Sequence, residues 1–411
     1  MSASPAPENE PADKSVVVVG SGWHFLSGIS YYTCRLSNAL AGRFDVGAIL
    51  MRRLLPERLY PGRERVGQPL SELRYEVPVF DGVDWWALPS LIKAMRFLRG
   101  RKPDVLVLQW WTGTVLHSYL ALALAARLLG ARVVIEFHEV QDTGEAAHRW
   151  AALYARLMIK PLLRLTSGVV VHSRFDLVAL LEAYGLEGTP AQIALHGPFD
   201  HHATVPAARR PVADSRCRLL FFGTIRPYKG LEDLIEAFGN LPESYHLTVV
   251  GETWEGWTLP AELIGASPAA DRITLVNRYV ADAEVDHCFA GADVVVLPYR
   301  RSSASGPLHI AMSHGLPVVV TAVGGLVEAA EGYSGAVMTP AAAPGDLAVA
   351  IERAAGLTGR RHADPSSWGR TVGAYARLLE EIGVPIALED QELLIATSSN
   401  QTVPALSPDL R

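Results

Sequence analysis

The chain has 411 residues, of which 49% are apolar and 19% are charged. This length predicts two globular domains of roughly 150 to 200 residues each rather than one large core. The formal net charge of −6 gives no reason to expect nucleic acid as a partner, so any anion-binding site must be local. The cysteines indicate neither a disulfide framework nor a zinc knuckle, because only Cys34, Cys217 and Cys288 occur and they are scattered.

Residues 1–13 are rich in Pro, Ala, Glu and Ser and lack the basic and apolar regions of a signal peptide, so we expect a disordered leader. The most apolar stretch, residues 115–129, is interrupted by His117, Ser118 and Arg127. It is too short for a membrane span and is typical of a core helix. We therefore expect a cytoplasmic protein that does not cross a membrane.

Residues 14–204 alternate short apolar runs with amphipathic segments of helical length. The predicted strands are Val16–Val19, Val46–Leu50, Val105–Leu108, Val133–Phe137 and Val169–Val171. The helices predicted between them include Tyr31–Ala41, Leu91–Leu98, Val115–Leu129 and Ala147–Leu165. Continuously apolar strands are typical of a parallel sheet covered by helices on both faces. This region is predicted to be a doubly wound, Rossmann-like α/β domain.

The first predicted strand runs into a glycine-containing loop that begins Gly20-Ser21-Gly22. Gly20 and Gly22 start a dinucleotide-binding fingerprint, but its third glycine is missing. The next strand, residues 46–50, also ends without the acidic residue that would bind a ribose. The sequence therefore disfavours NAD as a cofactor.

Residues 51–65 combine five arginines with Leu and Tyr, and a second basic stretch follows Trp85-Trp86. The cations concerned are Arg52, Arg53, Arg58, Arg63, Arg65, Lys93, Arg96, Arg99, Arg101 and Lys102. One interpretation is a solvated loop. The other is peripheral contact with anionic lipid at the inner membrane face, or with an acceptor phosphate.

His138 follows the strand predicted at residues 133–137 and should lie where that strand opens to a cleft. A single histidine at such a place is more often a hydrogen-bonded structural residue. His172 and His196 are weaker candidates for a functional role. The run Asp200-His201-His202 does not predict a metal site, because three adjacent side chains cannot converge on one ion without a turn.

The pattern of strands and helices restarts after a Pro- and Ala-rich linker at residues 205–213, which predicts a second Rossmann-like domain at 214–365. Its predicted strands are Leu219–Phe222, His246–Val250, Ile273–Val276, Val294–Leu297 and Val318–Thr321. A terminal helix within residues 366–384 is expected to pack back across the cleft between the domains. A polar tail at 385–411 is expected to have no fold of its own.

The turn after the strand at residues 219–222 carries two cations, Arg226 and Lys229, just before a helical segment at 231–238. Gly223 begins this turn. A forked guanidinium and a compact ammonium beside helix N-terminal amides suit the oxygens of a diphosphate. Taken singly, each cation is more often a solvated turn residue.

A second turn in the same domain ends in Ser305, Gly306 and Pro307, and a helix follows. Serine or glycine caps helices, and proline is preferred in the first turn, so free amides are expected here. They should face the same cleft as Arg226 and Lys229, because both turns follow parallel strands. Two helix N-termini and two cations on one anion are more specific than either turn alone.

With these motifs the chain resembles a retaining glycosyltransferase of family 4, which has the GT-B architecture of two Rossmann-like domains facing a cleft. The resemblance extends over nearly all of residues 15–382. The matching residues are Gly223, Arg226, Lys229-Gly230, Val249-Val250-Gly251-Glu252, Tyr279-Val280, Glu284-Val285, Ala292-Asp293, Pro298, Gly315-Leu316-Pro317-Val318-Val319, Gly324-Gly325 and Glu328.

The resemblance implies transfer of a sugar from a nucleoside-diphosphate donor to a glycan, glycolipid or small-molecule acceptor, without a metal cofactor. It implies that Arg226 and Lys229 hold the diphosphate and that His138 contacts the sugar or the acceptor, and we treat these three residues as the predicted catalytic set. The predicted donor-binding residues are Gly22, Gly28, Gly223, Glu252, Arg278, Tyr279, Val280, Ser305, Gly306, Pro307, Leu308 and His309.

The chain departs from the family pattern at two places. Thr224 stands where the family usually has an arginine, so Arg226 must reach the diphosphate from two residues later. The two spaced glutamates of the family fall at Ser302 and Ile310, neither of which is acidic. The candidate replacements, through hydroxyl, amide and imidazole groups, are Ser305, Gly306 and His309.

Two other functions remain open from the sequence. A sugar-nucleotide epimerase on the same fold would need an acid/base pair in the cleft, for which Glu139, Asp142 and His138 are the nearby set. A non-catalytic nucleotide-sugar binding protein is suggested by Ser302 and Ile310. The sequence does not identify the base, the sugar or the acceptor.

Overall fold

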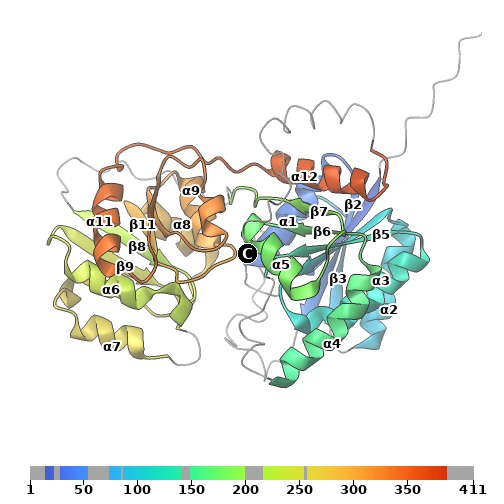
Figure 1. Ribbon diagram of the computed structural model, residues 1–411, viewed down its shortest axis with the longest axis horizontal. Coiled ribbons are helices and arrows are strands. Elements are labelled where there is room, and N and C mark those ends of the chain that lie inside the picture. Colours follow the sequence, from blue (N-terminus) through green and yellow to red (C-terminus); the bar gives the residue numbers. More distant parts are fainter. Residues whose placement is uncertain are drawn as a thin grey trace, which may run out of the picture.

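The computed structural model describes residues 14–22, 28–53, 74–84, 87–139, 149–199, 216–253 and 257–386. These residues form two lobes that lie side by side (Figure 1). The leader and the linker predicted at 1–13 and 205–213 lie outside the described residues, as does the tail from residue 387 onward.

The first lobe is built on a parallel sheet with the strand order β3-β2-β1-β4-β5-β6-β7. Its strands are β1 (Ser15–Ser21), β2 (Asp45–Arg53), β3 (Val79–Asp84), β4 (Val105–Trp110), β5 (Arg132–Phe137), β6 (Gly168–Val171) and β7 (Ala191–Ile193). Its helices are α1 (Gly28–Ala41), α2 (Leu88–Arg101), α3 (Leu116–Leu128), α4 (Arg149–Leu165) and α5 (Arg174–Tyr184).

The two faces of strand β1 explain why its sequence is apolar throughout. Val17 and Val19 pack into a core with residues of α2 and α3, whereas Val16 and Val18 pack into a second core with residues of α1. Both faces of the strand are therefore removed from water, as in other sheets covered by helices on each side.

The second lobe contains a parallel sheet with the order β10-β9-β8-β11-β12-β13. Its strands are β8 (Cys217–Phe222), β9 (Tyr245–Val250), β10 (Ile273–Val276), β11 (Val294–Leu297), β12 (Val318–Thr321) and β13 (Ala336–Thr339). Its helices are α6 (Leu231–Gly239), α7 (Leu259–Ala266), α8 (Asp282–Ala290), α9 (Gly306–His314), α10 (Leu326–Ala329) and α11 (Pro344–Ala355).

The prediction of two doubly wound, Rossmann-like domains is confirmed by these two sheets. In each sheet the strand order reverses at the centre. In the first sheet β2 and β4 lie on opposite sides of β1, and in the second β9 and β11 lie on opposite sides of β8. Ligands of such sheets bind beyond the carboxyl ends of the central strands, where the order reverses. The turns after β8 and β11 are therefore the places to look for a site.

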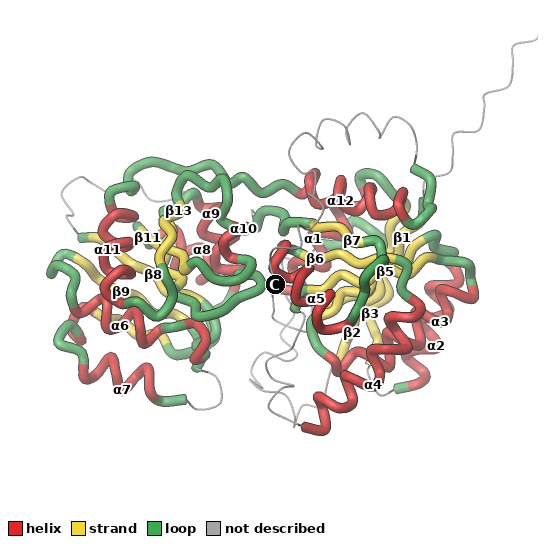
Figure 2. The backbone as a smooth tube through the Cα atoms, viewed as in Figure 1, coloured by secondary structure: helices red, strands yellow, loops and turns green. Residues whose placement is uncertain are grey.

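Helix α12 (Trp368–Glu381) lies against the first lobe although it follows the second lobe in sequence (Figures 1 and 2). The Thr371 hydroxyl donates a hydrogen bond of 2.8 Å to the Leu195 carbonyl, and the Trp368 indole donates one of 3.2 Å to the Pro198 carbonyl. Leu378 is fully buried in the core that contains β1. The chain thus crosses between the lobes a second time.

A carboxylate also links the lobes near the ends of the sheets. Glu328 of α10 accepts hydrogen bonds from the backbone amides of Arg174 and Phe175, at 2.8 and 3.1 Å. These amides begin helix α5, where a negative charge is stabilised by the helix dipole. The interaction holds the N-terminus of α5 against the second lobe.

Most of the basic segment singled out in the sequence lies outside the described residues, including Arg58, Arg63 and Arg65. Arg52 is described, and its guanidinium forms an ion pair with Asp84. The pairing neutralises one of the charges that a lipid surface would need. None of the described helices is long and apolar enough to cross a membrane.

Candidate functional site

The turn after β8 places the ammonium of Lys229 against the backbone of Gly223. Gly223 has a φ of +110°, which strains any residue with a side chain. A Cβ at this position would lie 2.8 Å from Lys229 Nζ and 3.5 Å from Pro307 Cγ. Because Gly223 has no Cβ, the Lys229 ammonium can pack directly against its backbone. Pro307, in the turn after β11, can approach the same point.

Lys229 is only 8% exposed, which is unusual for a lysine. Its Nζ lies 5.1 Å from the centre of the Tyr299 ring, a cation–π distance. Arg226 precedes the short 3-10 helix Pro227–Lys229 that carries this lysine. A partly buried ammonium acts more strongly on a nearby anion than one in open water, because the local dielectric is lower.

The second turn ends at the N-terminus of α9. Ser305 caps this helix, and its hydroxyl accepts a hydrogen bond of 3.3 Å from the Leu308 amide. Pro307 lies in the first turn, where an amide proton is not needed for the helix. The structure thus brings Gly223, Lys229 and Pro307 together, and a helix N-terminus lies beside the lysine.

A cavity of about 650 Å³ lies between the lobes. Its walls come from both domains, which suits a site that joins two substrates. The lining residues of interest are Gly28, Tyr32, His138, Glu139, His196, Tyr228, Arg301, Ser302 and Gly306.

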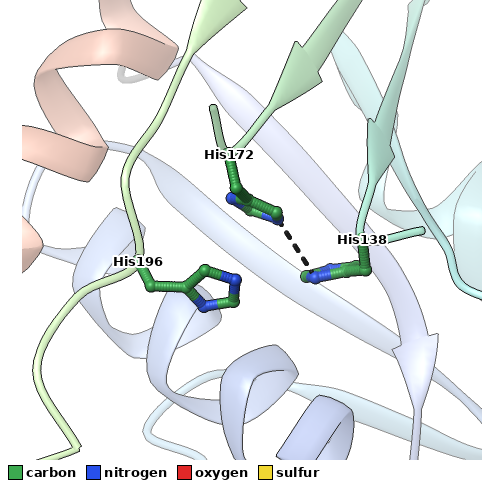
Figure 3. Close-up of side chains that lie close together, drawn as sticks. All are labelled: His138, His172 and His196. Carbon is green, nitrogen blue, oxygen red and sulfur yellow. Dashed lines mark hydrogen bonds between the residues drawn. The ribbon is translucent and has the colours of Figure 1, made fainter. Parts of the chain in front are cut away.

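Three histidines meet beside this cavity, at the ends of β5 and β6 and in the segment after β7 (Figure 3). His138 Nδ1 and His172 Nε2 are 3.1 Å apart. Nitrogen atoms of His138, His172 and His196 all lie within 4.8 Å of one another. The His172 Nδ1 is 2.8 Å from the Ala194 carbonyl, so it carries the proton and donates it there.

A buried carboxylate lies behind the histidines. Glu136 accepts hydrogen bonds from the Tyr32 hydroxyl at 2.6 Å and from the Gln109 amide at 3.1 Å. Its oxygens are 3.8 Å from His138 Nε2 and 3.9 Å from His172 Nε2. Among the described residues, neither lysine nor arginine forms an ion pair with it.

Burial shifts the titration of this cluster in two directions. Loss of hydration lowers the pKa of His172 and of His309 to about 4, and lowers the pKa values of His138 and His196 well below the usual 6.5. The same loss raises the pKa of Glu136 to about 7, against the opposing effect of its hydrogen bonds. Near neutral pH the histidines are therefore uncharged.

Other predicted donor residues lie along the ends of β9 and β10. The Glu252 carbonyl accepts a hydrogen bond of 2.9 Å from the Ile225 amide, which ties the turn after β8 to the end of β9. The Arg278 guanidinium forms a two-pronged ion pair with Glu284, at 3.0 and 2.5 Å. Tyr279 lies beside it and is half-buried.

Several of the predicted donor-binding residues have buried side chains. Val280 and Leu308 belong to the core of the second lobe, so only their backbone groups can reach a ligand. His309 is 4% exposed and its ring stacks on Phe199, with ring centres 5.7 Å apart.

The two predicted glycines of the first lobe lie at the start of the chain's first strand–helix unit. The Gly22 amide donates a hydrogen bond of 3.3 Å to the Met51 carbonyl, and Gly28 begins α1 at the cavity wall.

The two positions without the family's glutamates differ in their surroundings. Ser302 lines the cavity, and its hydroxyl donates a hydrogen bond of 2.9 Å to the Ala304 carbonyl. Ile310 is 6% exposed and belongs to the apolar core of the second lobe. Of the residues considered for an epimerase, His138 and Glu139 line the cavity, and Asp142 lies outside the described residues.

Sequence reasoning missed Glu136, Tyr32 and Gln109 as parts of this region. The signal was present for Glu136, because a charged residue interrupts the apolar strand β5 between Ile135 and Phe137. A carboxylate in such a run has no access to water and requires polar partners. The partners, Tyr32 and Gln109, come from α1 and β4 and have no local sequence signal.

Two family models match this chain in succession. Residues 27–198 match a glycosyl transferase 4-like domain, and residues 216–356 match glycosyl transferases group 1. The first match covers the lobe that holds the histidines, and the second covers the lobe that holds Lys229.

Relatives with curated names match parts of the chain. The D-inositol 3-phosphate glycosyltransferase of Geodermatophilus obscurus is 33% identical over 202 residues, which are 43% of this chain and 44% of that protein. The GDP-mannose:glycolipid 4-beta-D-mannosyltransferase of Xanthomonas campestris pv. campestris is 34% identical over 104 residues, 25% of this chain and 29% of that protein. The chain therefore matches less than half the length of each of these relatives.

Solved structures resemble the whole fold. HepE of Anabaena, in complex with UDP, has a TM-score of 0.61 at 17% identity and covers 93% of this chain and 99% of its own. The catalytic domain of starch synthase IV from Arabidopsis thaliana, bound to ADP and acarbose, has a TM-score of 0.62 at 14% identity, covering 94% and 99%. The likeness to these proteins supports a GT-B fold.

The pKa shifts predict that acid destabilises the protein. As the pH falls from 6.5 to about 4, His138, His172, His196 and His309 become protonated in the unfolded chain but stay neutral in the folded protein. The free energy of unfolding therefore falls by up to about 1.4 kcal/mol per histidine and pH unit. Glu136 acts oppositely, since its folded form keeps a proton up to about pH 7. Four histidines outweigh one carboxyl group.

Thermal unfolding at pH 7 and pH 5 measures this effect in the wild type, in His309→Gln and in His287→Gln. His309→Gln should lose less stability on acidification than the wild type, whereas His287→Gln, with an exposed side chain, should behave like the wild type. Identical losses in all three proteins would mean that His309 does not contribute.

Proposed function

We propose, for a chain that joins a glycosyl transferase 4-like domain to a group 1 domain, that the protein transfers a sugar from a nucleoside-diphosphate donor to an acceptor hydroxyl. The observation that carries this proposal is the position of the Lys229 ammonium beside Gly223 and the N-terminus of α9. Both groups favour an anion, and both follow central strands of the second sheet.

The proposed task of these groups is to stabilise the leaving diphosphate. Negative charge builds on the phosphate oxygens as the bond to the sugar breaks, so a fixed cation and helix amides bind the transition state more tightly than the ground state. Lys229 is nearly buried and therefore prearranged for this role. Arg226, three residues earlier, is proposed to add its guanidinium to the same diphosphate.

We propose that the anomeric configuration is retained. In this reaction the acceptor oxygen attacks the anomeric carbon on the face from which the diphosphate departs. The carbon–oxygen bond to the diphosphate breaks, a glycosidic bond forms, and the departing phosphate oxygen takes the acceptor proton. Lys229 and the α9 amides would stabilise that phosphate throughout the step.

The proposed binding site for the nucleoside lies along the ends of β9 and β10, near Glu252, Tyr279 and Val280. Two hydrogen bonds to Glu284 fix the orientation of the Arg278 guanidinium and leave the faces of its plane available for stacking on a base. HepE was solved with UDP, and starch synthase IV with ADP, which supports a nucleoside diphosphate as the bound group.

The sugar and the acceptor are proposed to occupy the cavity between the lobes. His138 is a proposed sugar contact, and Ser305, the Gly306 amide and His309 are the proposed replacements for the family's glutamates. His138 and Gly306 line the cavity, as does Ser302 at one of the glutamate positions, and the His309 ring centre lies 5.1 Å from that of His196 at the cavity wall. The acceptor is a glycan, a glycolipid or a small molecule with hydroxyl groups. The relatives named for D-inositol 3-phosphate and for a glycolipid support this class.

We also propose that the protein is cytoplasmic, because an enzyme there has direct access to nucleoside-diphosphate sugars. Peripheral contact with anionic lipid through the basic segment is compatible with a glycolipid acceptor, but Arg52 is already paired with Asp84. Lipid contact would therefore rest mainly on Arg58, Arg63 and Arg65.

The experiment that tests the function is incubation with a panel of nucleoside-diphosphate sugars, with and without an acceptor extract, followed by analysis of the free diphosphate and the sugar. Transfer predicts acceptor-dependent release of the diphosphate. An epimerase would change the sugar without release, and a binding protein would do neither. Arg226→Ala and Lys229→Ala should each raise the barrier by about 3 kcal/mol, mainly through kcat.

The matched controls are Arg353→Ala and Lys160→Ala, whose side chains are exposed on α11 and α4. They should retain wild-type turnover. If Arg226→Ala and Lys229→Ala also kept wild-type turnover, the diphosphate site would have to be sought elsewhere.

A second prediction concerns divalent ions. Because protein cations and helix amides are proposed to hold the diphosphate, UDP should bind with the same affinity in the presence of magnesium, manganese or a chelator. Isothermal titration calorimetry measures this directly. A large gain in affinity with magnesium or manganese would show that an ion bridges protein and diphosphate.

A further inference from the structure

Among the described residues, the hydrogen bonds of the three histidines beside the cavity leave some of their buried ring nitrogens without a partner. His172 donates its Nδ1 proton to the Ala194 carbonyl, so its Nε2 carries a lone pair. The 3.1 Å bond to His138 then requires a proton on His138 Nδ1. His138 Nε2 is left with a lone pair facing the oxygens of Glu136, and it has no hydrogen-bond partner in the described structure.

His196 has a similar deficit. Both of its ring nitrogens are buried and have no hydrogen-bond partner among the described residues. A polar atom taken out of water without a partner costs free energy. One of these nitrogens nevertheless lies within 4.8 Å of the ligand atoms of His138 and His172 (Figure 3).

We propose that His138, His172 and His196 bind one divalent transition-metal ion of the zinc class. The ion would accept the lone pairs of His138 Nδ1, His172 Nε2 and one nitrogen of His196. The His138 proton would then reside on Nε2 and point to the Glu136 carboxylate, 3.8 Å away. The ion would thus give a partner to one of the two His196 nitrogens and would turn His138 Nε2 into a donor that faces Glu136.

The distances fit such a site. Zinc–nitrogen bonds of about 2.0–2.1 Å in a tetrahedron put two ligand nitrogens about 3.3 Å apart. The His138–His172 separation of 3.1 Å is already close to that value. The His196 ring must move in by about 1.5 Å at most, while the Leu195 and Pro198 carbonyls on either side of it stay bonded to α12.

The groups around the three ligands are typical of those that orient metal-binding histidines. The Ala194 carbonyl fixes the tautomer of His172, and Glu136 would do so for His138. The charge of the Glu136 carboxylate would also be balanced by the ion. Imidazole nitrogen suits zinc, copper or nickel, whereas magnesium prefers oxygen, so this site is separate from any effect of magnesium on the donor.

A fourth coordination position would open toward the cavity, because His138 and His196 both line it. A water molecule or a substrate oxygen would occupy that position, as in other sites with three histidines. His138 is shared with the proposed sugar contacts, but Lys229 and Arg226 are not metal ligands, and ion binding is measured without any sugar donor. Metal binding and sugar transfer can therefore be tested separately.

The test is titration of the untagged full chain, first stripped with a chelator, with cobalt(II) as a spectroscopic probe for zinc. We expect the intense visible absorption of tetrahedral cobalt, saturation at one ion per chain, and displacement by zinc. His138→Gln, His172→Asn and His196→Ala should each weaken binding at least about tenfold. His172→Asn retains a donor for the Ala194 carbonyl, and His287→Ala, with an exposed side chain, should leave binding unchanged.

X-ray absorption of the zinc-loaded wild type keeps the test decisive if a variant fails to fold, because it counts the histidine ligands directly. Three histidines are expected. Absence of tetrahedral cobalt in the wild type, a zinc ion with fewer than three histidine ligands, or equal affinity in folded variants would overturn the proposal.

Discussion

The proposed anion site depends on the contact between the turns that follow the two central strands of the second sheet, β8 and β11. Gly223 has no side chain, and the Lys229 ammonium and the Pro307 ring lie within 2.8 and 3.5 Å of where its Cβ would be. This close approach fixes a nearly buried cation beside the N-terminus of α9. Neither group alone distinguishes a ligand site from a solvated turn, but their fixed separation creates a place where an anion is favoured over water.

The second lobe forms one wall of the cavity, and the first lobe forms the other. Helix α12 returns to the first lobe, and Glu328 accepts hydrogen bonds from the N-terminus of α5, so two further links hold the first lobe against the second. The cavity between the lobes, which Tyr228 and Gly306 of the second lobe also line, has room for a sugar and an acceptor. The proposed zinc site lies in the wall on the first-lobe side, so an ion there would shape the acceptor part of the cavity.

Much of this arrangement could be predicted from the sequence because it is local. Apolar runs gave the central strands, and the residues of each turn identified the cations and the cap at Ser305. Strand β3, with Asp81 and Asp84, and the three-residue strand β7 were missed because they lack a continuous apolar run. The histidine cluster was also missed, since its members come from three strand ends and only folding brings them together.

The measurement that tests the central claim most directly is hydrogen exchange with and without UDP. Exchange should slow in both turns, at residues 223–230 and at 305–309, since one diphosphate is proposed to contact both. Exchange at β13, remote from both turns, should not change. Protection of one turn alone, or protection confined to the first lobe, would contradict the convergence of the two turns on one anion.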